Sequence, residues 1–124
     1  MANLIIERGD STPFVKFLEN GKLLLEGRSL SEDPLAFFKP LIDWVRKLNL
    51  KKVELCLKME YLNTASTKTL MKLLKEVEDN INIESINIEW HYEMDDPDMI
   101  ELGELFEEEL ERVNFNYFET VEFE

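Results

Sequence analysis

The stretch Glu60-Tyr61-Leu62-Asn63-Thr64-Ala65-Ser66-Thr67 lies where the periodicity of the chain changes. Before it, apolar residues occupy every second position, as in a strand with one buried face: Val53, Leu55, Leu57, Met59 and Tyr61. After it they recur at helical spacing: Leu70, Leu73, Leu74 and Val77. The stretch therefore predicts a strand-to-helix turn that presents hydroxyl groups at a helix N-terminus. Unpaired N–H groups and the helix dipole stabilise a polar oxygen or a phosphate there.

The segment before this strand predicts further elements. Residues 4–6 suggest a short strand, and two apolar runs around Asn20-Gly21 predict a hairpin over residues 14–26. Residues 27–31 are predicted to form a turn. Asp33-Pro34 is typical of a helix start, and the apolar spacing continues that helix to about Leu48. Pro40 is expected to kink this helix or to delay its regular part.

The remaining chain continues the alternation of strands and helices. Residues 86–92 alternate like a strand, Asp96-Pro97 starts a third helix, and residues 115–123 suggest a last strand. Helices between strands imply parallel pairing, whereas the alternating strands imply one polar sheet face. The expected fold is α/β, bordering on α+β. It is a single two-layer domain over residues 1–124, with a mixed sheet, an N-terminal hairpin and three helices mainly on one face.

Composition and net charge limit the classes of molecule that the chain is expected to bind. The chain has 124 residues and a net charge of −13, so its field repels nucleic acid and anionic membranes and favours a basic protein surface. A single cysteine, no N-terminal leader and no apolar run of membrane length predict a cytoplasmic protein.

An acidic segment spans residues 93–111. It contains ten acidic residues and no basic one: Glu93, Asp95, Asp96, Asp98, Glu101, Glu104, Glu107, Glu108, Glu109 and Glu111. Two interpretations stay open, a solvated helix face and a docking face by which a constitutive acidic adaptor binds a basic partner. A calcium loop is not expected, because residues 95–98 lack the glycine and ligand spacing of an EF-hand.

Residues suited to catalysis or metal binding are few. His91 and Cys56 are the only residues of their types, and alternation turns both away from the core. They lie on different predicted strands and form neither a zinc-binding spacing nor a catalytic triad. An enzyme using Glu89, His91 or Cys56 is a rival hypothesis, but the sequence predicts no enzyme, no cofactor and no metal.

Thr64 has two interpretations. It is an N-cap, a position that threonine favours, or it is an acceptor of phosphate. Lys68 lies four residues further on, with Lys72 and Lys75 on one side of the same helix, so a phosphate would be tolerated. Rival acceptors are the other hydroxyl residues of the turn and first helical turns, which are Ser66, Thr67 and Thr69.

Several motifs in the same order resemble the SiaC-type bacterial regulatory phosphoproteins. They are Ser11-Thr12-Pro13, Ile42-Asp43-Trp44-Val45, Tyr61-Leu62-Asn63-Thr64-Ala65-Ser66, Trp90-His91-Tyr92 and Glu101-Leu102-Gly103-Glu104, and they cover nearly the whole chain. The resemblance implies a STAS-like fold, similar to anti-sigma-factor antagonists, and a non-enzymatic switch in a partner-switching pathway.

The resemblance also implies partners and site residues. In that family a kinase with a histidine-kinase-like ATPase fold phosphorylates the threonine that matches Thr64, and a metal-dependent Ser/Thr phosphatase reverses the reaction. The unmodified form binds and activates a diguanylate cyclase. The implied switch-turn and partner-binding residues are Tyr61, Leu62, Asn63, Ala65, Ser66 and Lys68. Family members often have serine at the position of Ala65. Because alanine has no hydroxyl group, this chain has one possible phosphate acceptor fewer.

Overall fold

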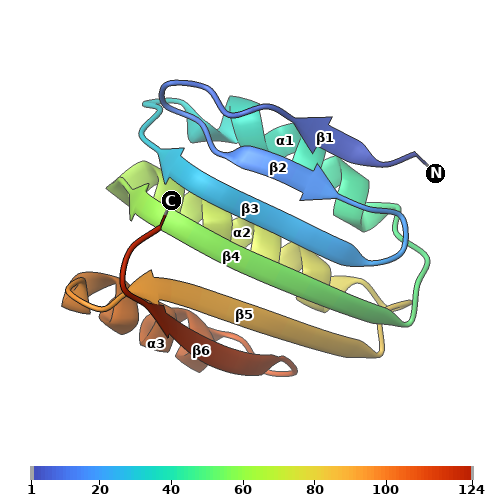
Figure 1. The fold of residues 1–124 in the computed structure, drawn as a ribbon. Helices are drawn as coiled ribbons and strands as arrows, with labels where there is room; N and C mark the ends of the chain where they lie inside the picture. The colour runs from blue at the N-terminus through green and yellow to red at the C-terminus, as the bar shows by residue number, and fades with distance from the viewer. Residues whose placement is uncertain (1, 124) are drawn as a thin grey trace.

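A computed structural model describes residues 2–123 and contains six strands and three helices. In chain order they are β1 (Leu4–Ile6), β2 (Phe14–Phe17), β3 (Lys22–Ser29), α1 (Pro34–Arg46), β4 (Lys52–Leu62), α2 (Thr64–Asp79), β5 (Ser85–Glu93), α3 (Pro97–Glu109) and β6 (Asn114–Thr120) (Figure 1). No helix of the described chain combines the length and hydropathy that crossing a bilayer requires.

All strands belong to one mixed sheet, in the spatial order β1-β2-β3-β4-β5-β6. The pairs β1–β2 and β2–β3 are antiparallel, whereas β3–β4, β4–β5 and β5–β6 are parallel. Each parallel pair is connected by one helix, as the alternation of elements predicts. The predicted fold class is confirmed.

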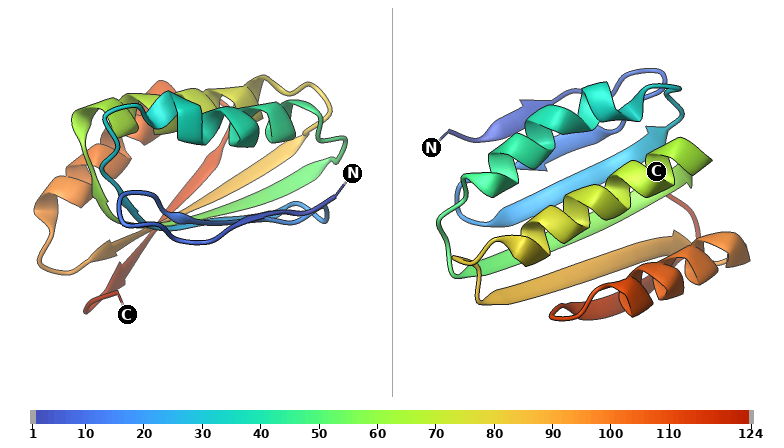
Figure 2. Two further views of the ribbon diagram at one scale, coloured as in Figure 1. Left: turned by 90° about the horizontal axis from the view of Figure 1, so that it is seen from above. Right: turned by 180° about the vertical axis from the view of Figure 1, so that it is seen from behind.

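The three helices cover one face of the sheet and leave the other face open (Figure 2). In β4 the side chains of Val53, Leu55, Leu57 and Met59 are buried beneath the helices. The residues between them point to the other side and are partly or fully exposed. We call this second side, which carries Glu54, Cys56 and Lys58, the open face.

The predicted turn at residues 27–31 is wrong, because β3 continues to Ser29. Gly27 has a φ of +127° and lies at a β-bulge in the pairing with β4. A Cβ at this position would lie 3.1 Å from the guanidinium of Arg8. The bulge therefore admits Arg8, which together with Arg28 pairs with Glu60 near the end of β4.

The helix starts follow the predicted capping residues for α1 and α3. Asp33 and Asp96 accept hydrogen bonds from the first turns, and a proline follows each of them.

Helix α1 ends at Arg46 rather than near Leu48, and it is not interrupted at Pro40. Pro40 lies on the exposed side, so water can solvate the carbonyl group that lacks its helical partner. The last strand is shorter than predicted and ends at Thr120.

Candidate functional site

The predicted strand-to-helix turn is present, and we call residues 61–66 the switch turn. Strand β4 ends at Leu62, and α2 begins at Thr64, six residues before the first apolar position of its stripe. Periodicity alone could not detect this first part of the helix, because its side chains are small or polar. The switch turn lies at the carboxyl end of the parallel strands, next to the end of β3 (Figure 1).

Asn63, not Thr64, is the N-cap of α2, which corrects the capping role predicted for Thr64. The Asn63 side chain accepts a hydrogen bond of 2.8 Å from the Ser66 N–H group. Its amide nitrogen donates to the Ser31 carbonyl, and its backbone N–H donates to the Ser29 carbonyl. Asn63 therefore starts the helix and also fixes the turn to the chain that follows β3.

Ser66 is buried, which excludes direct contact between its side chain and a partner in this conformation. Its Oγ lies 2.7 Å from the Oγ of Ser29, and both residues are almost fully inaccessible. This contact joins residues 37 positions apart. Ser66 was expected to contact a partner or to accept phosphate; in this conformation its side chain instead packs against Ser29 inside the protein.

Thr64 differs from the other hydroxyl residues of this region. Thr67 donates its hydroxyl to the Asn63 carbonyl, and Thr69 donates to the Ala65 carbonyl. Thr64 occupies the first helical position and is exposed, and its hydroxyl makes no hydrogen bond within residues 2–123. Of the hydroxyl groups at the start of α2, that of Thr64 is the one that is both accessible and free.

The surroundings of Thr64 contain the other predicted site residues. Tyr61 is 53% exposed, Ala65 and Lys68 are exposed, and Leu62 is partly buried against the core. Tyr61 and Leu30 line a shallow hollow beside Glu60. An aromatic ring, a free hydroxyl and an amine are therefore each accessible in this region of the chain.

The lysines of α2 do not act as one surface. Lys75 donates its Nζ to the Glu109 carbonyl at the end of α3, over a distance of 2.8 Å. Lys72 lines a hollow together with residues of α1 that include Asp43. Lys75 therefore offsets the negative end of α3, and Lys68 is the lysine next to the switch turn.

The acidic segment lies mainly on α3 at the edge of the molecule (Figure 1). Within residues 2–123, its ten acids form no ion pair with a lysine or arginine. Glu107 accepts a hydrogen bond of 2.7 Å from the Tyr117 hydroxyl, and burial together with this bond raises the pKa of Tyr117. Glu101, Glu104 and Glu108 are exposed, so the segment carries uncompensated charge.

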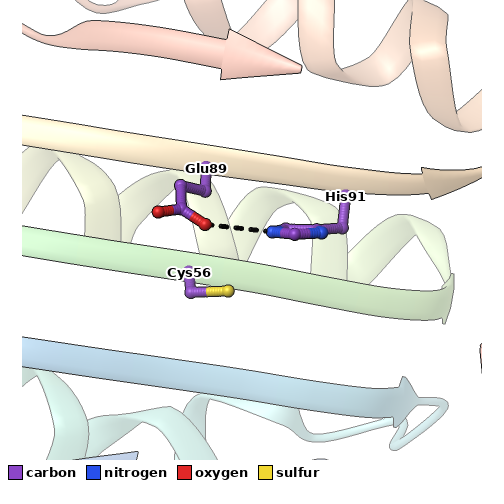
Figure 3. Close-up of side chains that lie close together, drawn as sticks. All are labelled: Cys56, Glu89 and His91. Carbon is purple, nitrogen blue, oxygen red and sulfur yellow. Dashed lines mark hydrogen bonds and ion pairs between the residues drawn. The ribbon is translucent and has the colours of Figure 1, made fainter. Parts of the chain in front are cut away.

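The open face brings together Cys56, Glu89 and His91, the three residues of the rival enzyme hypothesis, which the sequence did not predict to lie in contact. Cys56 of β4 is paired in register with Glu89 of β5, and His91 follows two positions later on the same side. Figure 3 shows the three side chains converging on the open face. Strand adjacency brings them together, so no local spacing in the sequence could reveal the cluster.

Cys56 is not an activated thiol in this environment. Its side chain is partly buried, and burial followed by the negative charge of Glu89 raises the pKa of the Cys56 thiol to about 11. A thiol with this pKa is almost entirely protonated at neutral pH and is a poor nucleophile. The neighbouring hollows lie on the sheet surface and are open to solvent. The site therefore lacks the features of a thiol-dependent enzyme.

Comparison with known proteins yields a match to one family model over most of the chain. The model of the SiaC family of regulatory phosphoproteins matches residues 6–120. An uncharacterised protein of Pseudomonas aeruginosa strain UCBPP-PA14 is 32% identical over 114 residues, which cover 88% of this chain and 90% of that protein.

Solved structures show the same fold. SiaC of Pseudomonas aeruginosa superposes with a TM-score of 0.80 and 30% identity, covering 97% of this chain and 100% of that chain. A second structure is the complex of the diguanylate cyclase SiaD with its activator SiaC from the same organism. The matched chain superposes with a TM-score of 0.80 and 28% identity, covering 93% of this chain and 99% of that one.

Proposed function

This chain belongs to the SiaC family of regulatory phosphoproteins, and from that premise we propose that it is a non-enzymatic switch protein controlled at Thr64. In this proposal the unmodified form binds and activates a diguanylate cyclase in the bacterial cytoplasm. A kinase with a histidine-kinase-like ATPase fold phosphorylates Thr64, and a metal-dependent Ser/Thr phosphatase removes the phosphate. The structure of SiaD with its activator SiaC supports the cyclase as the effector.

The observation that carries the proposal is the state of the Thr64 hydroxyl. It is exposed and free of hydrogen bonds among the described residues, whereas Ser66 is buried and Thr67 and Thr69 are bonded to backbone carbonyls. A kinase must reach its acceptor and bring the hydroxyl into line with the transferred phosphoryl group. Thr64 meets this requirement without unfolding of the turn.

The position of Thr64 also suits a removable phosphate. A phosphate at the first helical position lies beside unpaired backbone N–H groups and the positive end of the α2 dipole. Modification adds a charge of about −1.5 to −2 at this exposed position. Because Asn63 provides the cap, modification of Thr64 does not remove the hydrogen bond that starts the helix. The switch can therefore change the surface charge while the fold stays intact.

Phosphate mapping tests the acceptor directly. After incubation with ATP and a lysate of the native host, peptide mass spectrometry should place phosphate on Thr64. The Thr64→Ala variant should lose this label, whereas Thr69→Ala, which removes a bonded hydroxyl of the same helix, should keep it. Labelling of Thr69 or Ser66 in the unmodified chain, or full labelling of Thr64→Ala, would contradict the proposal.

A second candidate function rests on the unpaired acids of α3. A constitutive adaptor would use this segment to dock a basic partner regardless of phosphorylation. The observation that favours it is the absence of ion pairs to these acids among residues 2–123, since unpaired charges are available to a partner.

Neutralising this segment should weaken binding only if the adaptor function holds. The triple substitution of Glu101, Glu104 and Glu108 to Gln avoids Glu107, which bonds to Tyr117. At about 0.2–1 kcal/mol per exposed pair, binding to the basic partner should fall by about threefold to 150-fold, and its salt dependence should flatten. A control triple of Glu7, Glu19 and Glu32 to Gln makes the same charge change on other exposed sites. Equal affinity of both triples, measured by calorimetry, excludes the adaptor.

A further inference from the structure

The cluster on the open face combines three different metal-ligating groups. The thiol of Cys56, a carboxylate oxygen of Glu89 and an imidazole nitrogen of His91 all lie within 4.8 Å of one another. All three residues are partly buried; Cys56 and Glu89 are paired in register between β4 and β5, and His91 is paired with Phe118 of β6. Figure 3 shows the sulfur beside the line that joins the Glu89 oxygen to His91.

The distances are close to those of a tetrahedral zinc site. Zinc–nitrogen and zinc–oxygen bonds of about 2.0–2.1 Å and a zinc–sulfur bond of about 2.3 Å place neighbouring ligand atoms about 3.3–3.6 Å apart. The His91 Nε2 and the Glu89 Oε1 are already 3.1 Å apart. The Cys56 sulfur lies within 4.8 Å of both atoms, so it must approach them to complete a tetrahedral arrangement of ligands.

The surroundings hold these ligands in place. The His91 ring stacks on Phe118 of β6, with ring centroids 4.9 Å apart and an interplanar angle of 16°. Glu26, on the neighbouring β3, lines the hollow beside His91 and adds negative charge. Lys58 lines the same hollow and opposes a cation. Lys16, Lys22 and Glu54 line the adjoining hollow around Cys56 and Glu89, so basic as well as acidic side chains surround the cluster.

We propose that Cys56, Glu89 and His91 form a Zn²⁺ site on the open face, with a fourth position open to water or to a ligand from a partner. Binding of Zn²⁺ would release the thiol proton of Cys56 to solvent. The resulting thiolate, an imidazole and a carboxylate form a donor set that zinc accepts and that magnesium and calcium do not prefer. The site would bridge β4 and β5 on the side opposite the helices. It is independent of Thr64, since its three ligands lie on the sheet and none belongs to the switch turn.

Cobalt substitution tests this site with little interference from other thiol or imidazole groups, because Cys56 and His91 are the only cysteine and histidine of the chain. The full chain, without a histidine tag, should bind one equivalent of Co²⁺ and show a thiolate-to-cobalt charge-transfer band together with intense tetrahedral ligand-field bands. Zn²⁺ should displace the cobalt and remove both signals. Loss of a metal ligand should weaken binding by at least about tenfold, so we expect this of Cys56→Ser, His91→Gln and Glu89→Gln.

Two control variants separate this site from loose binding by acidic residues. Glu104→Gln removes a carboxylate of α3 and should leave cobalt binding unchanged. Lys58→Met removes one of the opposing charges and should tighten cobalt binding, an effect that a purely structural cluster would not show. Absence of the charge-transfer band, or equal zinc affinity of Cys56→Ser and the unmodified chain, overturns the proposal. Neither result bears on the phosphorylation of Thr64.

Discussion

Thr64→Glu should weaken binding to the diguanylate cyclase by about 30-fold or more. The substitution places a permanent charge at the exposed first position of α2, where the proposed complex would cover it. Leaving a buried charge without a partner in an interface costs about 2–5 kcal/mol, and about 1.4 kcal/mol corresponds to a tenfold change in affinity. Calorimetry with the purified cyclase domain measures the loss, and cyclase activity should fall in parallel.

Two controls isolate the position of the charge. Thr64→Val keeps the shape of the side chain without its hydroxyl, so it should bind the cyclase with nearly the affinity of the unmodified chain. Ile81→Glu adds the same charge beyond the other end of α2, at a side chain that is 93% exposed. Equal binding by Thr64→Glu and Ile81→Glu, with both variants folded, would show that the switch turn is not the cyclase contact.

Gly103→Ala should lower the free energy of unfolding by about 1–3 kcal/mol, although alanine is the better helix former by about 1 kcal/mol. A Cβ at this buried position would lie 2.7 Å from Nε1 and 2.8 Å from Cδ1 of Trp90, and 2.9 Å from Cε1 of Tyr117. The Trp90 ring cannot yield easily, because its Nε1 donates to the Met99 carbonyl and its ring packs against Phe106. Urea denaturation followed by circular dichroism measures the change.

A double-mutant cycle shows whether this contact is the cause. Trp90→Phe removes the nitrogen that the new methyl group would approach most closely, so Gly103→Ala should cost less in that background than in the unmodified chain. Leu105→Ala, at a half-exposed position of α3, should change stability by no more than about 0.5 kcal/mol. If Gly103→Ala proved neutral or stabilising, the close packing of α3 on β5 would be wrong.

Much of the fold could be predicted because its signals are local. Alternation in β4 and β5 identifies the buried faces, and Asp33-Pro34 and Asp96-Pro97 mark two helix starts that the structure confirms. The prediction was wrong at Gly27, where a glycine typical of turns admits Arg8 at a bulge. A local pattern cannot distinguish these two uses of glycine, because the difference depends on a residue from another strand.

The candidate site was likewise predictable in part from local signals, and its other features depend on tertiary contacts. The change of periodicity at residues 60–67 is enough to place a hydroxyl turn at the start of a helix, and the family resemblance singles out Thr64 within it. Which hydroxyl is free depends on tertiary contacts. Ser66 is buried because β3 brings Ser29 against it, and Asn63 is the cap that also binds the chain after β3.

The sequence by itself therefore determined the order of the elements, the buried face of each central strand and the place of the switch turn, since these depend on neighbours along the chain. Only the tertiary structure decided that Thr64 is the accessible hydroxyl, that Gly103 lies against Trp90, and that Cys56 meets Glu89 and His91. The physical reason is strand adjacency and register, which bring together side chains that are distant in the chain and leave no periodic signal in it.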